Sequence, residues 1–221
     1  ETVETLDIGT FSRDPQGSAS PAFVESISAN PSFATAFGRT LDVERHPFLR
    51  SHMIDGHPVL PVALMVEWLG HAAVHVHPGL QLHGLDHLRV LRGVVLRDGP
   101  PGLRFLTASG QRRGSVLEVP VELRGESAGA ILGAMGAAGE VLHARATAVL
   151  AGAWPPPPVL AVADSICDRR YPRGVRGAYS EILFHGEHFQ GIEEVVGFSA
   201  AGMVARLRAA PSPAKWMVDP L

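Results

Sequence analysis

Aliphatic and polar side chains alternate in several short stretches of this chain, which is the pattern of half-buried strands. The clearest example is residues 115–124, where aliphatic side chains stand at every second position: Leu117, Val119, Val121 and Leu123. This alternation predicts a strand with one buried face and one wet face, and Pro120 indicates a sheet edge or a bulge. Further stretches separated by Gly, Pro and charged turns predict strands over 85–96, 103–109 and 140–152.

A helical spacing governs residues 61–79, which we predict to form the main helix. Its apolar side chains recur three and four positions apart: Val62, Met65, Val66, Leu69, Ala72, Ala73 and Val76. Pro61 suits the first helical turn, and the Pro-Gly pair at the end of the stretch stops the helix. Leu64 and Trp68 lie outside this stripe, so the helix is apolar over most of its circumference. We therefore expect other structure to wrap around it.

The order of these elements predicts an α+β fold of the hot-dog type, in which an antiparallel sheet wraps one central helix. Before the helix, residues 39–47 alternate enough to predict a strand that Pro47 ends. After the strands, four consecutive prolines form a stiff spacer without donors for a sheet, which predicts a linker. The pattern therefore indicates two halves separated by a proline-rich joint.

The boundaries follow from this order of elements. We predict a lead-in segment at 1–38, a first hot-dog half at 39–152, a proline-rich linker at 153–162 and the start of a second half at 163–221. Asp219 and Pro220 are typical of a helix start, yet the chain stops at Leu221. We therefore expect the second half to stop where a second apolar helix should begin, so that it is truncated.

Composition narrows the class of protein. The 221 residues are 46% hydrophobic and 19% charged, which is enough apolar side chain for a sizeable core. The net charge of −3 comes without a basic stripe, so a nucleic-acid partner is disfavoured. No apolar run approaches the roughly 18 residues of a membrane span, and we expect no membrane partner.

The cysteine content and the N-terminus bear on location. The single cysteine, Cys167, excludes a disulfide framework and favours a reducing, cytoplasmic setting. Its two flanking aspartates disfavour a thiolate, so we interpret it as a spectator. The first residues lack both a signal-peptide pattern and an initiator Met, which predicts a piece of something longer.

Residues 52–61, with the sequence HMIDGHPVLP, hold the candidate chemistry. His52 precedes Gly56, which allows a turn with positive φ, and prolines lead rigidly into the predicted helix. The positive end of a helix keeps a nearby imidazole neutral and stabilises an enolate. A base that removes a proton next to a carbonyl needs both properties. On these residues alone, a turn histidine bonded to backbone remains the stronger interpretation.

The longer stretch HPFLRSHMIDGHPVLP, residues 46–61, resembles the HxxxGxxxxP signature of dehydratase domains in polyketide synthases and polyunsaturated-fatty-acid-type synthases. His52, Gly56 and Pro61 stand at the three signature positions, and HPFL matches the usual lead-in. The resemblance covers roughly residues 39–221. It implies a double hot-dog fold with the base in the first half and the acid in the second.

Two further landmarks of that family support the resemblance. A Y-G-P-x-F-like segment resembles LFHGEHFQGI, in which His185, Gly186 and Phe189 are in place and Glu187 stands where the family has proline. The closing WMVDPL resembles the lead-in to a helix with the catalytic Asp in a DxxxQ/H pattern. The resemblance places that Asp about one turn beyond Leu221.

The resemblance implies a hydro-lyase domain of a larger synthase, which dehydrates a β-hydroxyacyl thioester. His52 would remove the α-proton, and the Asp beyond Leu221 would protonate the departing hydroxyl. His57 could compete as the base, but the signature favours His52. The residues assigned to substrate binding are Gly56, Pro61, Tyr179, His185, Gly186 and Phe189. For the two aromatic residues in this set, plain core packing stays open.

The implied chemistry also names the partners. The substrate would arrive on the phosphopantetheine of an acyl carrier protein, and the reaction requires no metal and no redox cofactor. Neighbouring synthase domains and a second copy in a homodimer are the other expected partners. Two groups could in principle chelate a metal: Glu67, His71 and His75, and the set His185, Glu187 and His188. We favour a polar helix edge for the first, and immediate neighbours such as the second rarely converge on one ion.

Other functions stay open on the sequence. Double hot-dog domains of the same family act as product-template cyclases, shift double bonds or close cyclic ethers with the same histidine base. A catalytically silent structural domain is left open by Glu187 and by the position of the expected Asp past Leu221. A free-standing hot-dog thioesterase is disfavoured by the signature and by the polyproline joint.

Overall fold

The computed structural model describes residues 31–97, 99–125, 140–154, 156, 169–200 and 202–218. The chain divides into two compact units, Glu1–Pro31 and Ser32–Leu221. Every helix and strand described below belongs to the second unit. Most of the predicted linker, Cys167 and the predicted helix start at Asp219 lie outside the described residues. The predicted domain boundaries therefore stay predictions.

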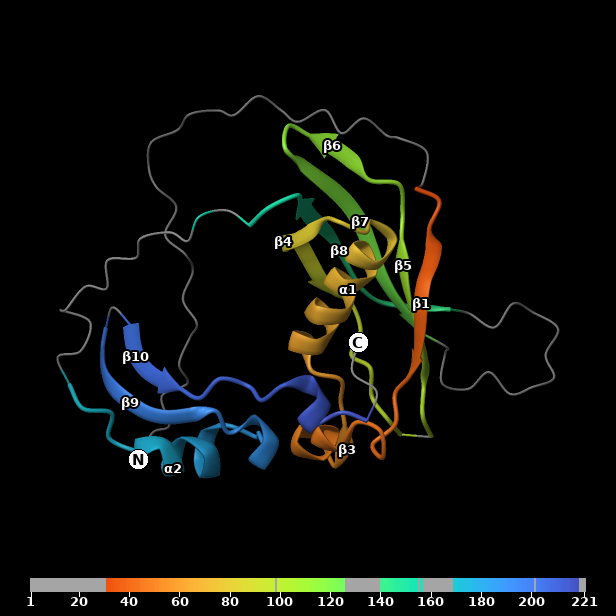
Figure 1. Ribbon diagram of the computed structural model, residues 1–221. Coiled ribbons are helices and arrows are strands. Elements are labelled where there is room, and N and C mark those ends of the chain that lie inside the picture. The colour runs from red at the N-terminus through yellow and green to blue at the C-terminus, as the bar shows by residue number, and fades with distance from the viewer. Residues whose placement is uncertain are drawn as a thin grey trace, which may run out of the picture. The chain divides into compact units, whose positions relative to one another are not determined.

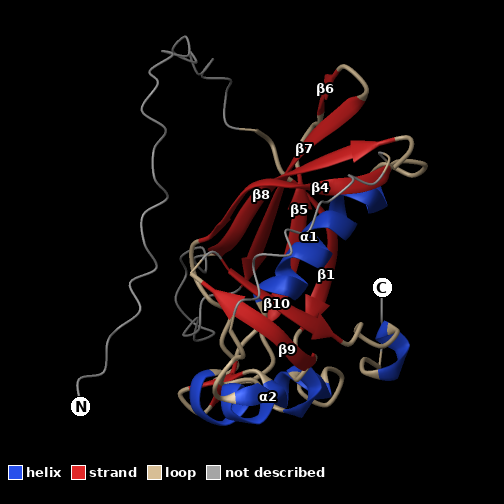
Figure 2. Ribbon diagram, turned by 90° about the vertical axis from the view of Figure 1, so that its left-hand side faces the viewer, coloured by secondary structure: helices blue, strands red, loops and turns tan. Residues whose placement is uncertain are grey.

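An antiparallel sheet forms the larger part of the described fold, with strand order β1-β5-β7-β8-β4 and β6 paired to β7. Its strands are β1 (Ala34–Thr40), β4 (Gln81–Val90), β5 (Gly102–Thr107), β6 (Gln111–Arg113), β7 (Val116–Gly125) and β8 (Val141–Ala151). Figure 2 shows these strands side by side, with the main helix across one face. The alternation correctly predicted β5, β7 and β8, whereas β4 begins earlier than predicted, at Gln81.

Pro120 does not mark a sheet edge, because β7 is an interior strand paired with β5 on one side and β8 on the other. The β5 ladder ends at Thr107 opposite Val121, and the β6 ladder resumes at Gln111 opposite Glu118. Pro120 lies between these two ladders, and its carbonyl accepts the Ala108 N–H at 3.0 Å. The missing proline N–H therefore falls at a break in the pairing, where its loss costs little.

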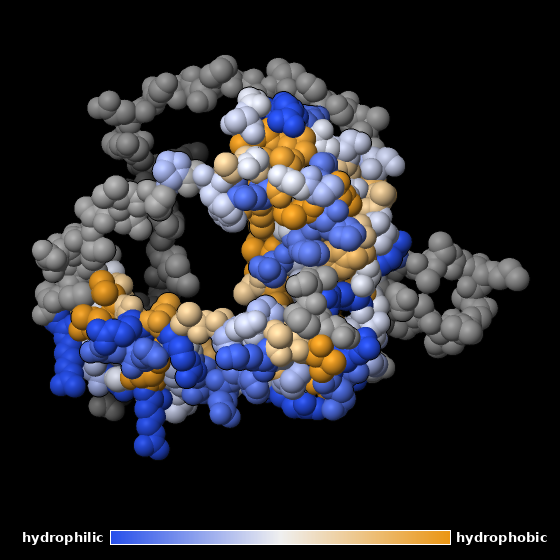
Figure 3. Space-filling model, in the orientation of Figure 1, coloured by the Kyte–Doolittle hydropathy of each residue, from blue (hydrophilic) through white to orange (hydrophobic). Residues whose placement is uncertain are grey.

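Helix α1 (Val62–Val76) lies against one face of the sheet (Figure 1) and contacts β1, β4, β5, β7 and β8. Its buried residues are Leu64, Met65, Trp68, Leu69, Gly70, Ala72 and Ala73. The predicted stripe is wrong at its margins, since Val62 is 49% and Val76 is 40% exposed, whereas Trp68 is 1% exposed. The larger side chains face the sheet because their burial removes more apolar surface from water. Figure 3 shows apolar surface left uncovered in the region of α1.

Trp68 organises the aromatic part of the core between α1 and the sheet. Its ring meets Phe105 of β5 edge-on, with the ring centroids 5.7 Å apart. Phe105 in turn stacks on Phe37 of β1 at 4.7 Å. The guanidinium of Arg39 lies 5.2 Å from the centre of the Trp68 ring, a cation–π geometry. The helix is thus locked to the strands by side chains distant in the sequence.

The predicted strand over 39–47 is wrong beyond Thr40, where β1 ends. The Asp42 side chain accepts the Glu44 N–H at 2.9 Å, and the Asp42 carbonyl accepts the His46 N–H at 2.8 Å. Such local bonds favour a turn over a sheet ladder. Pro47 then begins the 3-10 helix η1 (Pro47–Ser51), which leads to the site described below.

The described residues from 169 to 218, here called the second-half segment, hold short helices and one hairpin. The elements are α2 (Gly174–Gly177), η3 (Ala178–Ile182), η4 (Glu187–Phe189), β9 (Ile192–Ser199), β10 (Gly202–Leu207) and η5 (Pro213–Lys215). β9 and β10 pair antiparallel. One helix against an antiparallel sheet is the predicted hot-dog α+β arrangement, and the described residues cover part of a double hot-dog.

Candidate active site

His52 is held in a tight hairpin just before helix α1. It follows η1 directly, and its backbone N–H donates to the Leu49 carbonyl at 3.0 Å. Strands β2 (Met53–Ile54) and β3 (His57–Pro58) then pair across Asp55 and Gly56, whose φ angles are 49° and 78°. Two successive positive φ angles are the requirement of a type I′ hairpin turn, which glycine meets without strain. The positive φ predicted for Gly56 is confirmed.

The hairpin also orients the imidazole. Nδ1 of His52 lies 2.9 Å from the carbonyl oxygen of Val59. A carbonyl can only accept, so Nδ1 carries a proton, and in the neutral ring Nε2 is the nitrogen with the lone pair. Val59 stands three residues before the start of α1, and the ring is therefore tied to a rigid element. The backbone bond fits a structural histidine, yet it also leaves Nε2 in the form that a general base needs.

Three rings from the second-half segment surround this imidazole. Phe184 meets His52 edge-on with the ring centroids 5.0 Å apart. The rings of Phe189 and His185 lie at 5.6 Å and 5.7 Å. The structure therefore brings the predicted residues His185 and Phe189 to His52, which stands more than 130 positions before them in the chain. Phe184 was not predicted, although it stands next to His185 in the second landmark.

His185 adds a second titratable group beside the candidate base. Partial burial lowers the pKa of His185 below its ordinary value of 6.5, and the nearby His52 lowers it further. Its imidazole is therefore neutral at neutral pH and can donate or accept one hydrogen bond at each nitrogen. Because the His185 ring is neutral, it places no positive charge beside His52 that would disfavour transfer of a proton to His52.

The loop that carries these rings is bonded to Ser51, the residue before His52. The Gly186 N–H donates to the Ser51 carbonyl at 2.8 Å. The His188 N–H donates to the Ser51 Oγ at 3.3 Å, and the His188 Nδ1 lies 3.0 Å from the same oxygen. Sequence reasoning missed Ser51, and its place beside the predicted base was the available signal.

The remaining predicted site residues hold the framework around the base. Besides its contact with His52, the Phe189 ring meets the Phe48 ring edge-on, with the centroids 6.0 Å apart. The hydroxyl oxygen of Tyr179 accepts the Ile192 N–H at 2.9 Å, so this oxygen braces the start of β9. Pro61 precedes α1 with extended backbone, outside the first turn where the sequence placed it, and its carbonyl accepts the Leu64 N–H at 3.0 Å.

His46 and His71 make their ring contacts with residues outside this cluster of rings. His46 is 2% exposed, and its Nδ1 donates to the Asp42 carbonyl at 3.0 Å, which holds the turn before η1. His71 meets Phe37 edge-on at 5.5 Å, and burial lowers its pKa. Within the described ranges, no group of three His, Cys, Asp or Glu side chains is arranged to hold a metal ion.

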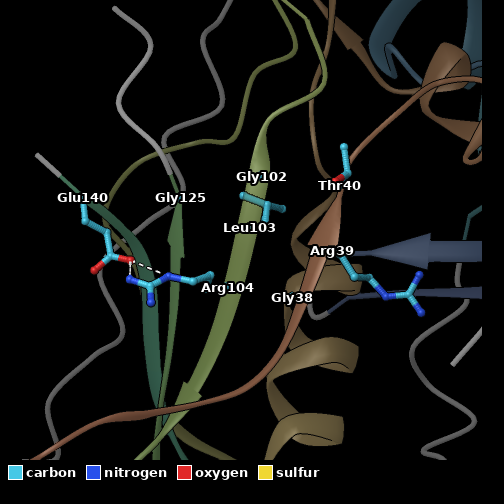
Figure 4. A pocket seen from close by; sticks show the side chains of 8 residues that line it. All are labelled: Gly38, Arg39, Thr40, Gly102, Leu103, Arg104, Gly125 and Glu140. Atoms are coloured by element: carbon cyan, nitrogen blue, oxygen red, sulfur yellow. Dashed lines mark hydrogen bonds and ion pairs between the residues drawn. The ribbon is translucent and has the colours of Figure 1, made fainter. Parts of the chain in front are cut away.

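A separate pocket of about 460 Å³ lies at the edge of the sheet (Figure 4). Its lining residues are Gly38, Arg39, Thr40, Gly102, Leu103, Arg104, Gly125 and Glu140. Arg104 points toward Glu140 and donates to it from Nε at 3.0 Å, whereas Arg39 points away from this pair. The lining includes neither His52 nor any ring around it, so this pocket is not assigned to the chemistry of the site. As for membranes, the helices of the described ranges are all too short or too polar to span one.

Comparison with known proteins agrees with the hairpin signature. Residues 23–118 match the family model described as "Polyketide synthase dehydratase domain", and this range includes His52, Gly56 and Pro61. A polyunsaturated fatty acid synthase subunit of Thraustochytrium sp. (strain ATCC 26185 / S-3) is 29% identical over 174 residues. The match covers 78% of this chain but 6% of that protein, so this chain corresponds to a small part of it.

Solved structures share the fold. A dehydratase domain of a trans-AT polyketide synthase from Brevibacillus brevis is 21% identical, with a TM-score of 0.60 over 86% of this chain and 69% of that one. A histidine-to-phenylalanine inactive mutant of the CurK dehydratase is 16% identical, with a TM-score of 0.53 over 77% of this chain and 56% of that one. This chain thus spans between 56% and 69% of these dehydratases. Residues 23–118 thus match the model of the polyketide synthase dehydratase domain family, and the described residues share the fold of solved dehydratase domains.

Proposed function

We propose that this chain acts as a dehydratase domain of a polyketide or fatty-acid-type synthase and eliminates water from a β-hydroxyacyl thioester. The observation that carries the proposal is the imidazole of His52, whose Nδ1 is bonded to the Val59 carbonyl while Nε2 is left as a proton acceptor. The base is thus in the correct tautomer before substrate binds. Removal of a proton next to a thioester carbonyl is the reaction that this arrangement suits best.

The elimination balances with one base and one acid. Nε2 of His52 takes the α-proton, and the electron pair of the broken C–H bond forms the Cα–Cβ double bond. The Cβ–O bond breaks, and the departing hydroxyl takes a proton from the acid and leaves as water. The carbon skeleton undergoes no net oxidation or reduction, so the reaction needs no redox cofactor. By family resemblance, the acid is an Asp of the second-half helix, about one turn beyond Leu221.

The walls of the site support this chemistry. Phe184 and Phe189 place two apolar rings beside His52, at 5.0 Å and 5.6 Å between ring centroids. The neutral ring of His185 can hydrogen-bond to an oxygen of the substrate. Gly56 and Pro61 hold the hairpin, Gly186 admits the loop to Ser51, and Tyr179 and Phe189 are proposed to border the acyl or pantetheine channel.

The partners follow from the proposed substrate. We expect the acyl chain to arrive on the phosphopantetheine of an acyl carrier protein, beside neighbouring domains of one synthase. Support comes from the Thraustochytrium relative, which belongs to a polyunsaturated fatty acid synthase and is matched over 6% of its length. A homodimer stays a prediction.

The test compares His52→Phe with His57→Phe in the longest polypeptide that carries the chain. Each is incubated with a 3-hydroxyacyl thioester, and the enoyl product is detected by its loss of one water. His52→Phe should slow the reaction by roughly 10²- to 10⁴-fold, the usual contribution of a general base. The His57 variant should keep most of the activity, because the signature places the base at His52. The CurK mutant described as inactive, with phenylalanine in place of a histidine, supports this expectation.

The same assay separates the alternatives. Equal turnover in both variants would refute the assignment of His52 as the base. A cyclised, isomerised or ring-closed product would favour a cyclase, an isomerase or a cyclic-ether-forming domain with the same base. A folded wild type that converts no thioester would favour a structural domain.

A further inference from the structure

We infer that Ser51 is a positioning residue, which holds residues 184–189, the wall loop, against the imidazole of His52. The wall loop carries all three rings that surround His52: Phe184, His185 and Phe189. Ser51 itself touches no reacting atom and acts through this loop. The turnover part of the test below rests on the proposed function, whereas the structural part does not.

Ser51 binds the wall loop through its backbone carbonyl and through its side-chain hydroxyl. Its carbonyl accepts the Gly186 N–H at 2.8 Å, and its Oγ accepts the His188 N–H at 3.3 Å. The same Oγ lies 3.0 Å from the His188 Nδ1. Ser51 thus binds both Gly186, which precedes η4, and His188, which lies within η4. His52 follows Ser51 directly in the chain.

The hydroxyl of Ser51 has no easy substitute. Ser51 is 7% exposed, so its O–H needs a partner inside the protein. Because Oγ already accepts the His188 N–H, its own proton is best donated to Nδ1, with the His188 proton on Nε2. Alanine at position 51 would leave the His188 N–H and Nδ1 without this partner. The Ser51 hydroxyl, which is buried, has its partners on His188 while the wall loop lies against Ser51.

Gly186 shows how close the approach is. Its φ of −75° is open to any residue, so the backbone conformation does not require glycine. A Cβ built at this position would lie 2.9 Å from both the Cα and the Oγ of Ser51. Real Cβ atoms do not come this near to a backbone atom, so any side chain would push the wall loop away. Glycine is present here because the contact is tight.

The test breaks the contact from each side, with Ser51→Ala and Gly186→Ala. The matched controls are Ser115→Ala in an exposed turn and Gly152→Ala, where a Cβ meets nothing within 4 Å. Amide hydrogen exchange is measured over residues 184–190 and, as an internal reference, over α1. Both contact variants should exchange about tenfold faster in the wall loop, the effect of losing one hydrogen bond, and unchanged in α1. The controls should match the wild type.

Turnover provides the second readout. If the wall loop positions the rings, kcat should fall by roughly 10- to 100-fold with a smaller change in KM, as expected for a misplaced site. Unchanged exchange in the wall loop for both variants would overturn the inference, and so would an equal rise in α1. Faster loop exchange with unaltered kcat and KM would also overturn it. If the wild type has no turnover, the proposed function fails, and exchange alone decides the role of Ser51.

Discussion

The candidate base His52 lies in the first half, and the wall loop that faces it lies in the second-half segment. The described residues of these two regions differ strongly in how many large side chains they bury. Around His52, the first half packs α1 and its sheet over large, fully buried side chains, among them Phe48, Leu49, Leu60 and Trp68. In the described part of the second-half segment, the buried apolar residues are Ala178 and Met217. Strands β9 and β10 expose Val196, Met203 and Leu207. Among the described residues, the large buried side chains therefore lie around His52 in the first half, and the second-half segment contributes few of them.

This difference shows where the geometry of the site comes from. The first half orients His52 by local bonds that need nothing from the second-half segment. The wall loop contacts the first half through the bonds to Ser51 and the Phe48–Phe189 ring contact. Further along the second-half segment, Trp216 meets Phe48, and the Val218 N–H donates to the Arg45 carbonyl at 3.0 Å. Damage to the first half should unfold the protein, whereas damage to these contacts should disturb the site selectively.

The largest expected effect is in the core of the first half. Trp68→Ala removes the ring that packs on Phe105 and leaves a cavity, so the free energy of unfolding should fall by about 3–5 kcal/mol. Denaturant unfolding followed by circular dichroism measures this loss. Val62→Ala on the exposed side of the same helix should change it by no more than about 0.5 kcal/mol. Comparable losses for the two variants would contradict the observed burial of α1.

An intermediate effect is expected from two buried histidines of the first half. Burial lowers the pKa of His46 and of His143 below the ordinary 6.5 in the folded protein, and both return to about 6.5 when it unfolds. Below pH 6.5 the unfolded chain therefore binds more protons than the folded one. The free energy of unfolding should be fully retained above this pH and should fall as the pH decreases through it.

Thermal unfolding between about pH 7.5 and 5.5 measures this dependence. His46→Phe keeps a ring against Trp68 but removes one titrating group, so it should flatten the slope. His87→Asn is the control, because this residue is exposed and asparagine tolerates its φ of 54°. A slope equal to that of the wild type in His46→Phe would show that His46 does not contribute.

The smallest effect is expected from an ion pair of the second-half hairpin. Arg206 donates to Glu194 at 2.7 Å, and both side chains are exposed, so Glu194→Gln should cost about 0–1 kcal/mol. The matched change in the first half is Glu122→Gln, because Glu122 is buried and accepts from Arg124 Nε at 2.7 Å. The loss should be larger there, since an unpaired partner near the interior is poorly solvated. If Glu194→Gln lowered the free energy of unfolding more than Glu122→Gln, the expected difference between the second-half hairpin and the first half would be contradicted.

Local patterns predicted the elements that depend on local chemistry. The alternation in residues 115–124 located β7, and the helical spacing located α1, because period and burial are coupled within one element. Prediction failed at 39–47, where the Asp42 side chain bonds its own neighbours and ends the strand. It also misjudged Pro120, since the break between the β5 and β6 ladders is a property of three strands together.

The sequence on its own pointed to His52 as the candidate base: a histidine before an Asp-Gly turn and a proline-led helix, within a stretch that resembles the dehydratase signature. It also assigned Gly186 to the site, through its place in the stretch LFHGEHFQGI. Only the tertiary structure decided that Ser51 meets this glycine and that Phe184, His185 and Phe189 enclose His52. The physical reason is the range of the forces involved. Turns and helix starts depend on bonds between residues close together in the sequence. The position of the wall loop depends on packing between segments far apart in the sequence, and no local pattern in either segment predicts that contact.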